Sequence, residues 1–395
     1  MTDFRIAILL NGSETINYFE ELTNLWRLKS GLSSDQSQSV LYYNVADATS
    51  TSNPFFRFIM HYTGHGYSSF LDDIYLNLLD QIKRAYDQRQ VTRNGTINIS
   101  LFGFSDGATL ARHFGTEYIQ KRLIEDMPPH IKAMGIKIKL DAEYLFDSLL
   151  LPIPTTVSVI SRFSLLNIKP ASYYNTAIPY ETKSYHAVSL DEFDCEIEPQ
   201  LIDAKENSEE VWFAGDHLDI GGGHMVPATV QSPITANHSL RYMVQRAREN
   251  GLTFYPSFVD KLQKEGSSKL LSEIHNLSRD LRFHERKVRD VYVKRKGNVT
   301  EELPIVHESV LSRMKDAPRP YYQPVSLLAT FKEVKVLTND GTRATARFEE
   351  ESTTNPPVLT SYEQHLTRSK GIGKKALAPQ QITQQPKKPT PVKCR

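Results

Sequence analysis

The chain has 395 residues, of which 39% are hydrophobic and 24% are charged, and its formal net charge is +1. These values are ordinary for a globular protein, and two cysteines, Cys195 and Cys394, exclude a disulfide framework. No stretch approaches the roughly 18 apolar residues that a membrane span needs. The apolar run near the N-terminus, residues 6–10, is too short for a signal peptide, so we expect a cytoplasmic protein or export that needs no N-terminal signal.

Strands and helices are predicted to alternate along the first 250 residues. Short runs rich in β-branched and aromatic residues predict strands, and apolar spacings of three and four predict helices. This order is typical of an α/β fold, an α/β-hydrolase-like mainly parallel sheet with helices on both faces. The predicted strands are 4–10, 39–45, 96–102, 136–146, 186–190 and 211–215, and the predicted helices are 18–28, 68–87 and 108–119.

The texture of the sequence changes after residue 250. Residues 258–296 look helical and highly charged, and periodicity is lost from about residue 339. Residues 368–395 hold eight Lys or Arg and no acid, so the rest of the chain carries a net charge of about −7. We therefore expect a catalytic core over 1–250, a mostly helical extension over 251–338, and a largely disordered basic tail over 339–395.

A pentapeptide with the pattern Gly-x-Ser-x-Gly follows the strand at 96–102 and precedes the helix at 108–119. It runs from Gly103 to Gly107 with Ser105 at its centre. In a strand–turn–helix of this kind the serine projects above the sheet, and the small residues on either side let backbone pack closely around the turn. The pattern predicts Ser105 as a nucleophile. The alternative is a glycine-rich turn that carries a solvated serine.

A serine nucleophile needs a base and an acid that orients the base, and in this fold class the acid precedes the histidine in the chain. Asp147 ends the next predicted strand, on the same edge as Ser105, and is the candidate acid; its alternative role is a helix N-cap. His217 follows a later strand in a glycine-rich loop and is the candidate base. His224 and His238 are its rivals.

The oxyanion hole is expected to consist of backbone N–H groups. One comes from the residue after the nucleophile, Asp106, and the other from the loop after the first strand, at Gly12. The segment 64–66 (Gly-His-Gly) is an alternative wall of this pocket. A metal site built from His217, Asp219 and His224 matches no firm ligand spacing, so we expect neither a metal nor a cofactor.

These motifs together resemble a known family. LFGFSDGATLAR, YLFDSL, SYHAVSLDE and EVWFAGDHLDIGGGH occur in the order of the nucleophile, aspartate, His-Ala-x-x-x-Asp-Glu and histidine motifs of the α/β-hydrolase family catalogued as domain-of-unknown-function 2235 type. That family includes phospholipase effectors of bacterial type VI secretion. The resemblance covers roughly residues 4–328. It implies Ser105 as nucleophile, Asp147 as acid, His217 as base, and hydrolysis of a lipid ester.

Three positions depart from the family pattern. Asp106 stands where the family usually has Arg, Asn-Gly-Ser at 11–13 replaces an opening Asp-Gly-Thr, and Ser-Leu-Leu follows Asp147 in place of the usual Thr-Val. An acid beside the oxyanion position opposes the developing negative charge. The alternative expectation is therefore a catalytically weak or inactive relative that acts by binding a partner or a membrane.

The partners that we expect follow from charge and from the resemblance. The expected substrate is a phospholipid or another lipid ester, and a secretion or immunity partner is left unnamed. Residues 279–296 hold eight Lys or Arg against three acids, which suits a basic helix on an anionic membrane surface, although a solvated helix face is the simpler interpretation. Nucleic-acid binding needs a wider basic surface than this acidic body offers.

Overall fold

A computed structural model describes residues 3–12, 20–48, 65–149, 176–193, 198–224, 234–266, 289–316, 322–349 and 358–365. The chain divides into two compact units. The first unit comprises Met1–Tyr185 and Met243–Asp260, and the second comprises His186–Tyr242 and Lys261–Arg395. Among the described residues, no helix has the length and apolar character needed to cross a membrane.

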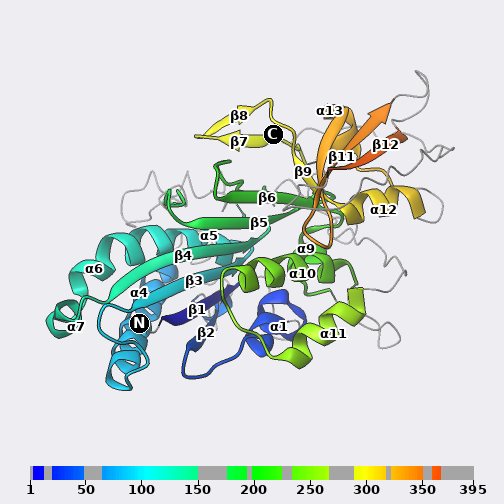
Figure 1. Cartoon of the computed structure of the whole chain (residues 1–395). Helices are drawn as coiled ribbons and strands as arrows, with labels where there is room; N and C mark the ends of the chain where they lie inside the picture. The colour runs from blue at the N-terminus through cyan, green and yellow to red at the C-terminus, as the bar shows by residue number, and fades with distance from the viewer. Residues whose placement is uncertain are drawn as a thin grey trace, which may run out of the picture. The chain divides into compact units, whose positions relative to one another are not determined.

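The sheet of the first unit contains β1 (Phe4–Asn11), β2 (Gln38–Asn44), β3 (Thr96–Phe104) and β4 (Lys137–Phe146). These strands pair in parallel in the order β2-β1-β3-β4 (Figure 1). Gly103 on β3 pairs with Leu10 on β1 and with Leu145 on β4. The carboxyl ends of three neighbouring strands therefore lie level with one another, at the edge where open α/β sheets bind their ligands.

Both faces of this sheet are covered. Successive side chains of a strand point to opposite faces of the sheet. Every residue of β1 except Arg5 is buried, so both faces of β1 are shielded from solvent. One face packs against α4 (His65–Asp87) and α5 (Asp106–His113) in a single apolar cluster. Helix α1 (Asn24–Gly31) also contacts β1 and β3, and Thr23 caps it by accepting the Trp26 N–H. The remaining helical turns of this unit are η1 (Glu20–Leu22), α2 (Val45–Ala48), η2 (Phe114–Arg122), α6 (Leu123–Asp126) and α7 (Pro129–Ala133).

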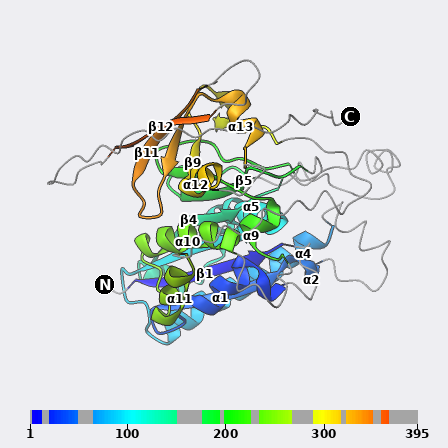
Figure 2. The same ribbon diagram turned by 90° about the vertical axis from the view of Figure 1, so that its right-hand side faces the viewer.

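The second unit has its own run of paired strands. These are β5 (Lys183–Ser189), β6 (Ser208–Phe213), β9 (Ile305–His307), β10 (Glu333–Leu337), β11 (Arg343–Glu349) and β12 (Val358–His365). They lie in the order β5-β6-β9-β10-β11-β12. Strands β6, β9 and β10 pair in parallel, whereas β11 pairs antiparallel with both β10 and β12. Figures 1 and 2 both show β11 and β12 side by side.

The other elements of the second unit are a short hairpin and several helices. The hairpin pairs β7 (Val293–Arg295) with β8 (Asn298–Thr300). The helices are α9 (His217–Gly221), α10 (Ile234–Glu249), α11 (Pro256–Gly266), α12 (Glu308–Asp316) and α13 (Val325–Thr330). The boundary between the two units falls within β5, α10 and α11.

The mostly parallel sheet with its covering helices confirms the predicted α/β class. Two stretches differ from the expectation. Of the predicted helix over 258–296, residues 258–266 lie in α11 and residues 293–295 form β7, so the described part of the basic segment 279–296, residues 289–296, is not helical. Strands β11 and β12 lie within the predicted tail, because buried Ala344, Ala346 and Phe348 give β11 an apolar face that packs in the core. Residues 267–288 and 366–395 lie outside the described residues.

Candidate active site

Ser105 occupies a strained turn between β3 and α5. Its backbone dihedrals are φ 60° and ψ −129°, a region that only glycine adopts readily. The side chain is 1% exposed, so it is not the solvated serine of the alternative interpretation. Ser105 stands at the N-cap position of α5 but makes no capping hydrogen bond, and among the described residues its Oγ has no hydrogen-bond partner. No hydrogen bond of the Ser105 hydroxyl therefore compensates for the strain of its backbone.

The glycines around Ser105 are required by close packing. A Cβ atom added at Gly103 would lie 2.3 Å from the Cα of Ala108, and one added at Gly107 would lie 2.3 Å from the carbonyl oxygen of Leu10. Contacts below 3 Å do not occur for real side chains, so the turn can be this tight only if both positions lack Cβ. The close packing holds the end of β3 and the start of α5 against the end of β1.

Asp106 follows Ser105 as the first residue of α5, and its side chain is 2% exposed. Its Oδ2 accepts a hydrogen bond of 3.2 Å from the hydroxyl of Tyr67, a fully buried residue of α4. The backbone N–H of Asp106 belongs to the first turn of α5, where such groups have no partner within the helix. Asp106 is thus packed inside the first unit, and its carboxylate accepts from a specific donor.

Asp147 follows β4 directly and lies in the first unit with Ser105. It is fully buried and has a φ of 38°. The two turns are joined through backbone, since the Ser105 N–H donates to the Phe146 carbonyl (3.1 Å) and the Leu149 N–H donates to the Ser105 carbonyl (3.4 Å). Thr109 on α5 adds a hydrogen bond to the Leu149 carbonyl. The candidate nucleophile and the candidate acid therefore lie on adjacent, hydrogen-bonded strand ends.

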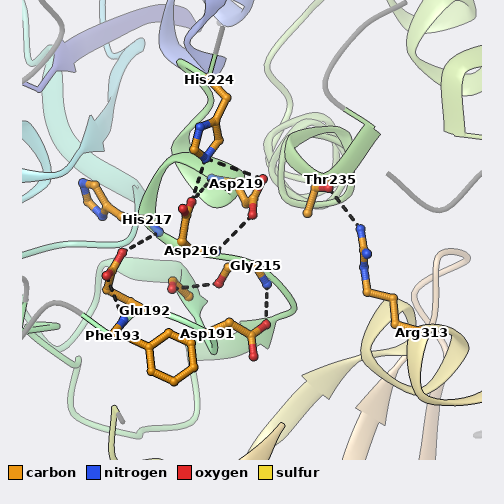
Figure 3. A network of polar contacts seen from close by, with 11 residues as sticks. Asp191, Glu192, Phe193, Gly215, Asp216, His217, Asp219, His224, Thr235 and Arg313 are labelled. Carbon is orange, nitrogen blue, oxygen red and sulfur yellow. Dashed lines mark hydrogen bonds and ion pairs between the residues drawn. The ribbon is translucent and has the colours of Figure 1, made fainter. Parts of the chain in front are cut away.

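His217 belongs to the second unit, where it is the first residue of α9 and fully buried. Asp216 is the N-cap, and a capping box joins it to Asp219: each carboxylate accepts the backbone N–H of the other residue (Figure 3). The His217 N–H donates to Glu192 Oε2 at 3.1 Å. Carboxylate side chains therefore bind three successive parts of the α9 N-terminus: the backbone N–H groups of Asp216, His217 and Asp219.

The structure groups Asp216, not His217, with Asp219 and His224. One ligand atom from each of the three lies within 4.8 Å of the others, so they are the described residues best placed to hold a metal ion. Hydrogen bonds already account for this approach, because His224 Nε2 lies 2.8 Å from Asp216 Oδ1 and both carboxylates take part in the capping box. The His217 ring points away from this cluster (Figure 3). The set that could hold a metal therefore differs from the one weighed from the sequence, with Asp216 in place of His217.

The two rival histidines have structural surroundings. His224 is paired with Asp216 as described. His238 on α10 is half-buried beside His307, with ring centroids 5.4 Å apart. Burial, followed by the charges of Arg313 and Arg241, lowers the pKa of His238 to about 4. A histidine held neutral in this way is a weak base near neutral pH.

A buried acid, Asp191, lies beside the loop that carries His217. Burial raises its pKa to about 7, although hydrogen bonds from the Gly215 N–H and the Tyr322 hydroxyl favour the ionised form. Burial likewise lowers the pKa of Arg313, whose guanidinium donates to Thr235. No sequence pattern predicted a role for Asp191 or for Tyr67. The Asp-Glu at the end of SYHAVSLDE was the available signal for the first, and a tyrosine at the start of a helix gives none.

The structure thus brings together Ser105, Asp106, Gly12 and Asp147 in the first unit and places His217 in the second. A Cβ atom added at Gly12 would lie 2.8 Å from the Cβ of Ser105, so the end of β1 lies beside the candidate nucleophile. The oxyanion-hole role of Gly12 and Asp106 stays a prediction. Ser13 and the side chains of the alternative segment 64–66 lie outside the described residues.

Residues 138–246 match the family model of the type VI secretion phospholipase effector Tle1-like catalytic domain. Over this segment the chain resembles the Tle1-like family. The match confirms the resemblance seen in the sequence motifs. The Tle1-like segment contains Asp147 and His217 and begins after Ser105. Among curated proteins, no sequence matches the chain.

Solved structures that match part of the chain share little of its sequence. An uncharacterized protein from Pseudomonas aeruginosa is 14% identical with a TM-score of 0.42, over 67% of this chain and 49% of that protein, so the chain spans about half its length. The Tle1 effector bound to the VgrG spike of the type VI secretion system is 14% identical with a TM-score of 0.44, over 66% and 76%. A putative cell surface hydrolase from Lactobacillus plantarum is 10% identical with a TM-score of 0.31, over 67% and 98%.

Proposed function

We propose that the chain is a serine-dependent hydrolase of a phospholipid or another lipid ester. The strained backbone of Ser105 is the observation that carries this proposal. Strain of this kind persists only where the surrounding structure imposes it, and it is concentrated at functional sites. The match of residues 138–246 to a phospholipase effector family supports a lipid ester as the substrate class.

The proposed reaction follows from the chemistry of the residues. The Ser105 hydroxyl attacks the ester carbonyl carbon while His217 accepts its proton, and the alkoxide of the collapsing tetrahedral intermediate leaves with that proton. Water then attacks the acyl-enzyme, again with His217 as base, and releases the fatty acid and Ser105. In this proposal Asp147 holds the imidazole. The backbone N–H groups of Asp106 and Gly12 stabilise the oxyanion.

The proposal also includes partners other than the substrate. The matched family is named for secretion effectors, so we propose a secretion or immunity partner as well as transient contact with a lipid surface. The alternative function is a binding protein without catalytic activity. It predicts that Ser105→Ala leaves the biological effect unchanged.

The decisive experiment is labelling with a fluorophosphonate probe, followed by identification of the modified residue and a panel of lipid esters. The proposed function predicts labelling at Ser105 and hydrolysis of at least one ester. Matched controls are Ser100→Ala, a buried serine on the same strand, which should still label, and Ser105→Ala, which should not. Absence of both labelling and hydrolysis in the folded protein would overturn the proposal.

A further inference from the structure

We infer that Glu192 and Asp191 are positioning residues for His217, because together they hold the backbone of the loop that carries this histidine. The inference rests on the proposed function, in which His217 is the base. It adds two residues of the second unit, neither of which belongs to the proposed triad. Figure 3 shows both acids beside the loop that leads into α9.

Glu192 fixes the first residue of α9. Its Oε2 accepts the His217 N–H at 3.1 Å, and its Oε1 accepts the Phe193 N–H at 2.8 Å. The first N–H groups of a helix have no acceptor within the helix, and the Glu192 carboxylate supplies an acceptor for one of them. Glu192 is only 2% exposed, and both of its oxygens are bound to backbone. A side chain used in this way sets the position from which the His217 imidazole projects.

Asp191 fixes the residue two positions earlier. Its Oδ2 accepts the Gly215 N–H at 2.7 Å and the hydroxyl of Tyr322, also at 2.7 Å. The Gly215 carbonyl in turn accepts from the Asp191 N–H (3.0 Å) and from the hydroxyl of Ser189 (2.9 Å). Both polar groups of the Gly215 backbone are therefore bound to one short segment, residues 189–191.

Gly215 shows why the loop needs this support. Its φ is +125°, and a Cβ atom there would lie 2.4 Å from the Cβ of Asp219, so only glycine fits. Glycine is also the residue with the most conformational freedom, so the loop could move at this position. A catalytic base displaced by about 1 Å slows the reaction roughly 100-fold. Bonds from residues 189–192 to Gly215 and His217 remove that freedom on either side of the N-cap residue.

The test compares Glu192→Ala with Glu209→Ala, in full-length protein. Glu209 is a matched control because it is also a buried glutamate of the second unit, but it pairs with Arg343. Active sites are counted by fluorophosphonate titration, and kcat and KM per active site are measured from pH 5 to 9. We expect Glu192→Ala to lower kcat about 10- to 100-fold with KM nearly unchanged and to shift the acidic limb of the pH profile. Glu209→Ala should change only the number of folded active sites.

Two further variants keep the result decisive. If Glu192→Ala does not fold, Glu192→Gln is used: its amide presents a donor to one of the two N–H groups, and kcat per site should fall at least about fivefold. Asp191→Ala should act in the same direction through Gly215. A per-site kcat and pH profile like those of the wild type in the Glu192 variants, with His217→Asn inactive, would overturn the positioning role. Full activity of His217→Asn would instead overturn the choice of base in the proposed function, and the positioning role with it.

Discussion

The backbone of Gly12 lies directly against Ser105, with 2.8 Å between the Cβ of Ser105 and the place where a Cβ would stand on Gly12. The end of β1 and the turn after β3 therefore touch at the proposed nucleophile. The contact exists because β1 and β3 are parallel neighbours in register, so their carboxyl ends meet at one edge.

Gly12→Ala tests this contact. The added methyl group cannot be placed without moving Ser105 or the Phe104 carbonyl, so we expect kcat per folded molecule to fall at least tenfold and stability to fall by about 1–3 kcal/mol. Gly31→Ala is the control, because its Cβ would meet the Phe258 ring at 2.5 Å, away from Ser105. It should lower the melting temperature and leave kcat unchanged. Equal kcat in both variants would contradict the prediction.

Two substitutions at Ser105 separate strain from chemistry. Both Ser105→Ala and Ser105→Gly should lose hydrolysis, because each lacks the hydroxyl. Only glycine adopts φ 60° and ψ −129° without strain, so Ser105→Gly should be more stable than Ser105→Ala by about 1 kcal/mol. Urea unfolding of the two inactive proteins measures the difference. If the alanine variant is equally or more stable, the backbone is not strained as described.

The carboxylate of Asp106 offers a second test of the site. Asp106→Asn keeps the shape and an acceptor for the Tyr67 hydroxyl but removes a negative charge beside the proposed oxyanion, so we expect kcat to rise by up to about tenfold. Tyr67→Phe keeps the charge but removes its donor, and should lower stability by about 1–3 kcal/mol. Steady-state kinetics and thermal unfolding check the pair. A lower kcat in Asp106→Asn would show that the charge assists the reaction.

The buried Asp191 predicts one pH dependence of stability. Burial raises the pKa of its carboxyl to about 7 in the folded protein, from an ordinary value of 3.8. Between these values the folded chain holds a proton that the unfolded chain releases, so stability falls as pH rises from about 4 to 7. The contribution is at most about 4 kcal/mol. Asp191→Asn should remove this slope in unfolding measurements at several pH values, and an unchanged slope would refute the assignment.

His238 predicts the opposite dependence. Its pKa in the folded protein is about 4, below the ordinary 6.5, mainly because its surroundings desolvate the charged imidazolium. As pH falls through that window, the unfolded chain takes up a proton that the folded chain does not, so stability is lost by up to roughly 3 kcal/mol. His238→Phe keeps a ring beside His307 and should flatten the loss of stability between pH 6.5 and 4. A variant that still loses as much stability as the wild type would place the effect elsewhere.

Local sequence determined much of this protein. The aliphatic run of β1, the apolar spacing of α4 and the strand before Ser105 are short-range patterns, and each predicted its element. The glycines of the pentapeptide likewise predicted a tight turn, because the requirement for a missing Cβ is a property of the turn itself. Residues 343–349 were misread, since the alternation in β11 is short and β11 is stabilised by pairing with a strand earlier in the chain and a strand later in it.

Only the tertiary structure decided which distant groups meet. Tyr67 reaches Asp106 across 39 positions, and Tyr322 reaches Asp191 across 131. No periodicity in the chain encodes such contacts, because they depend on how strands and helices pack once the sheet has formed. The sequence thus determined the tight turn that carries Ser105. Packing decided that Asp106 is held by a tyrosine and that the His217 loop is held by two buried acids.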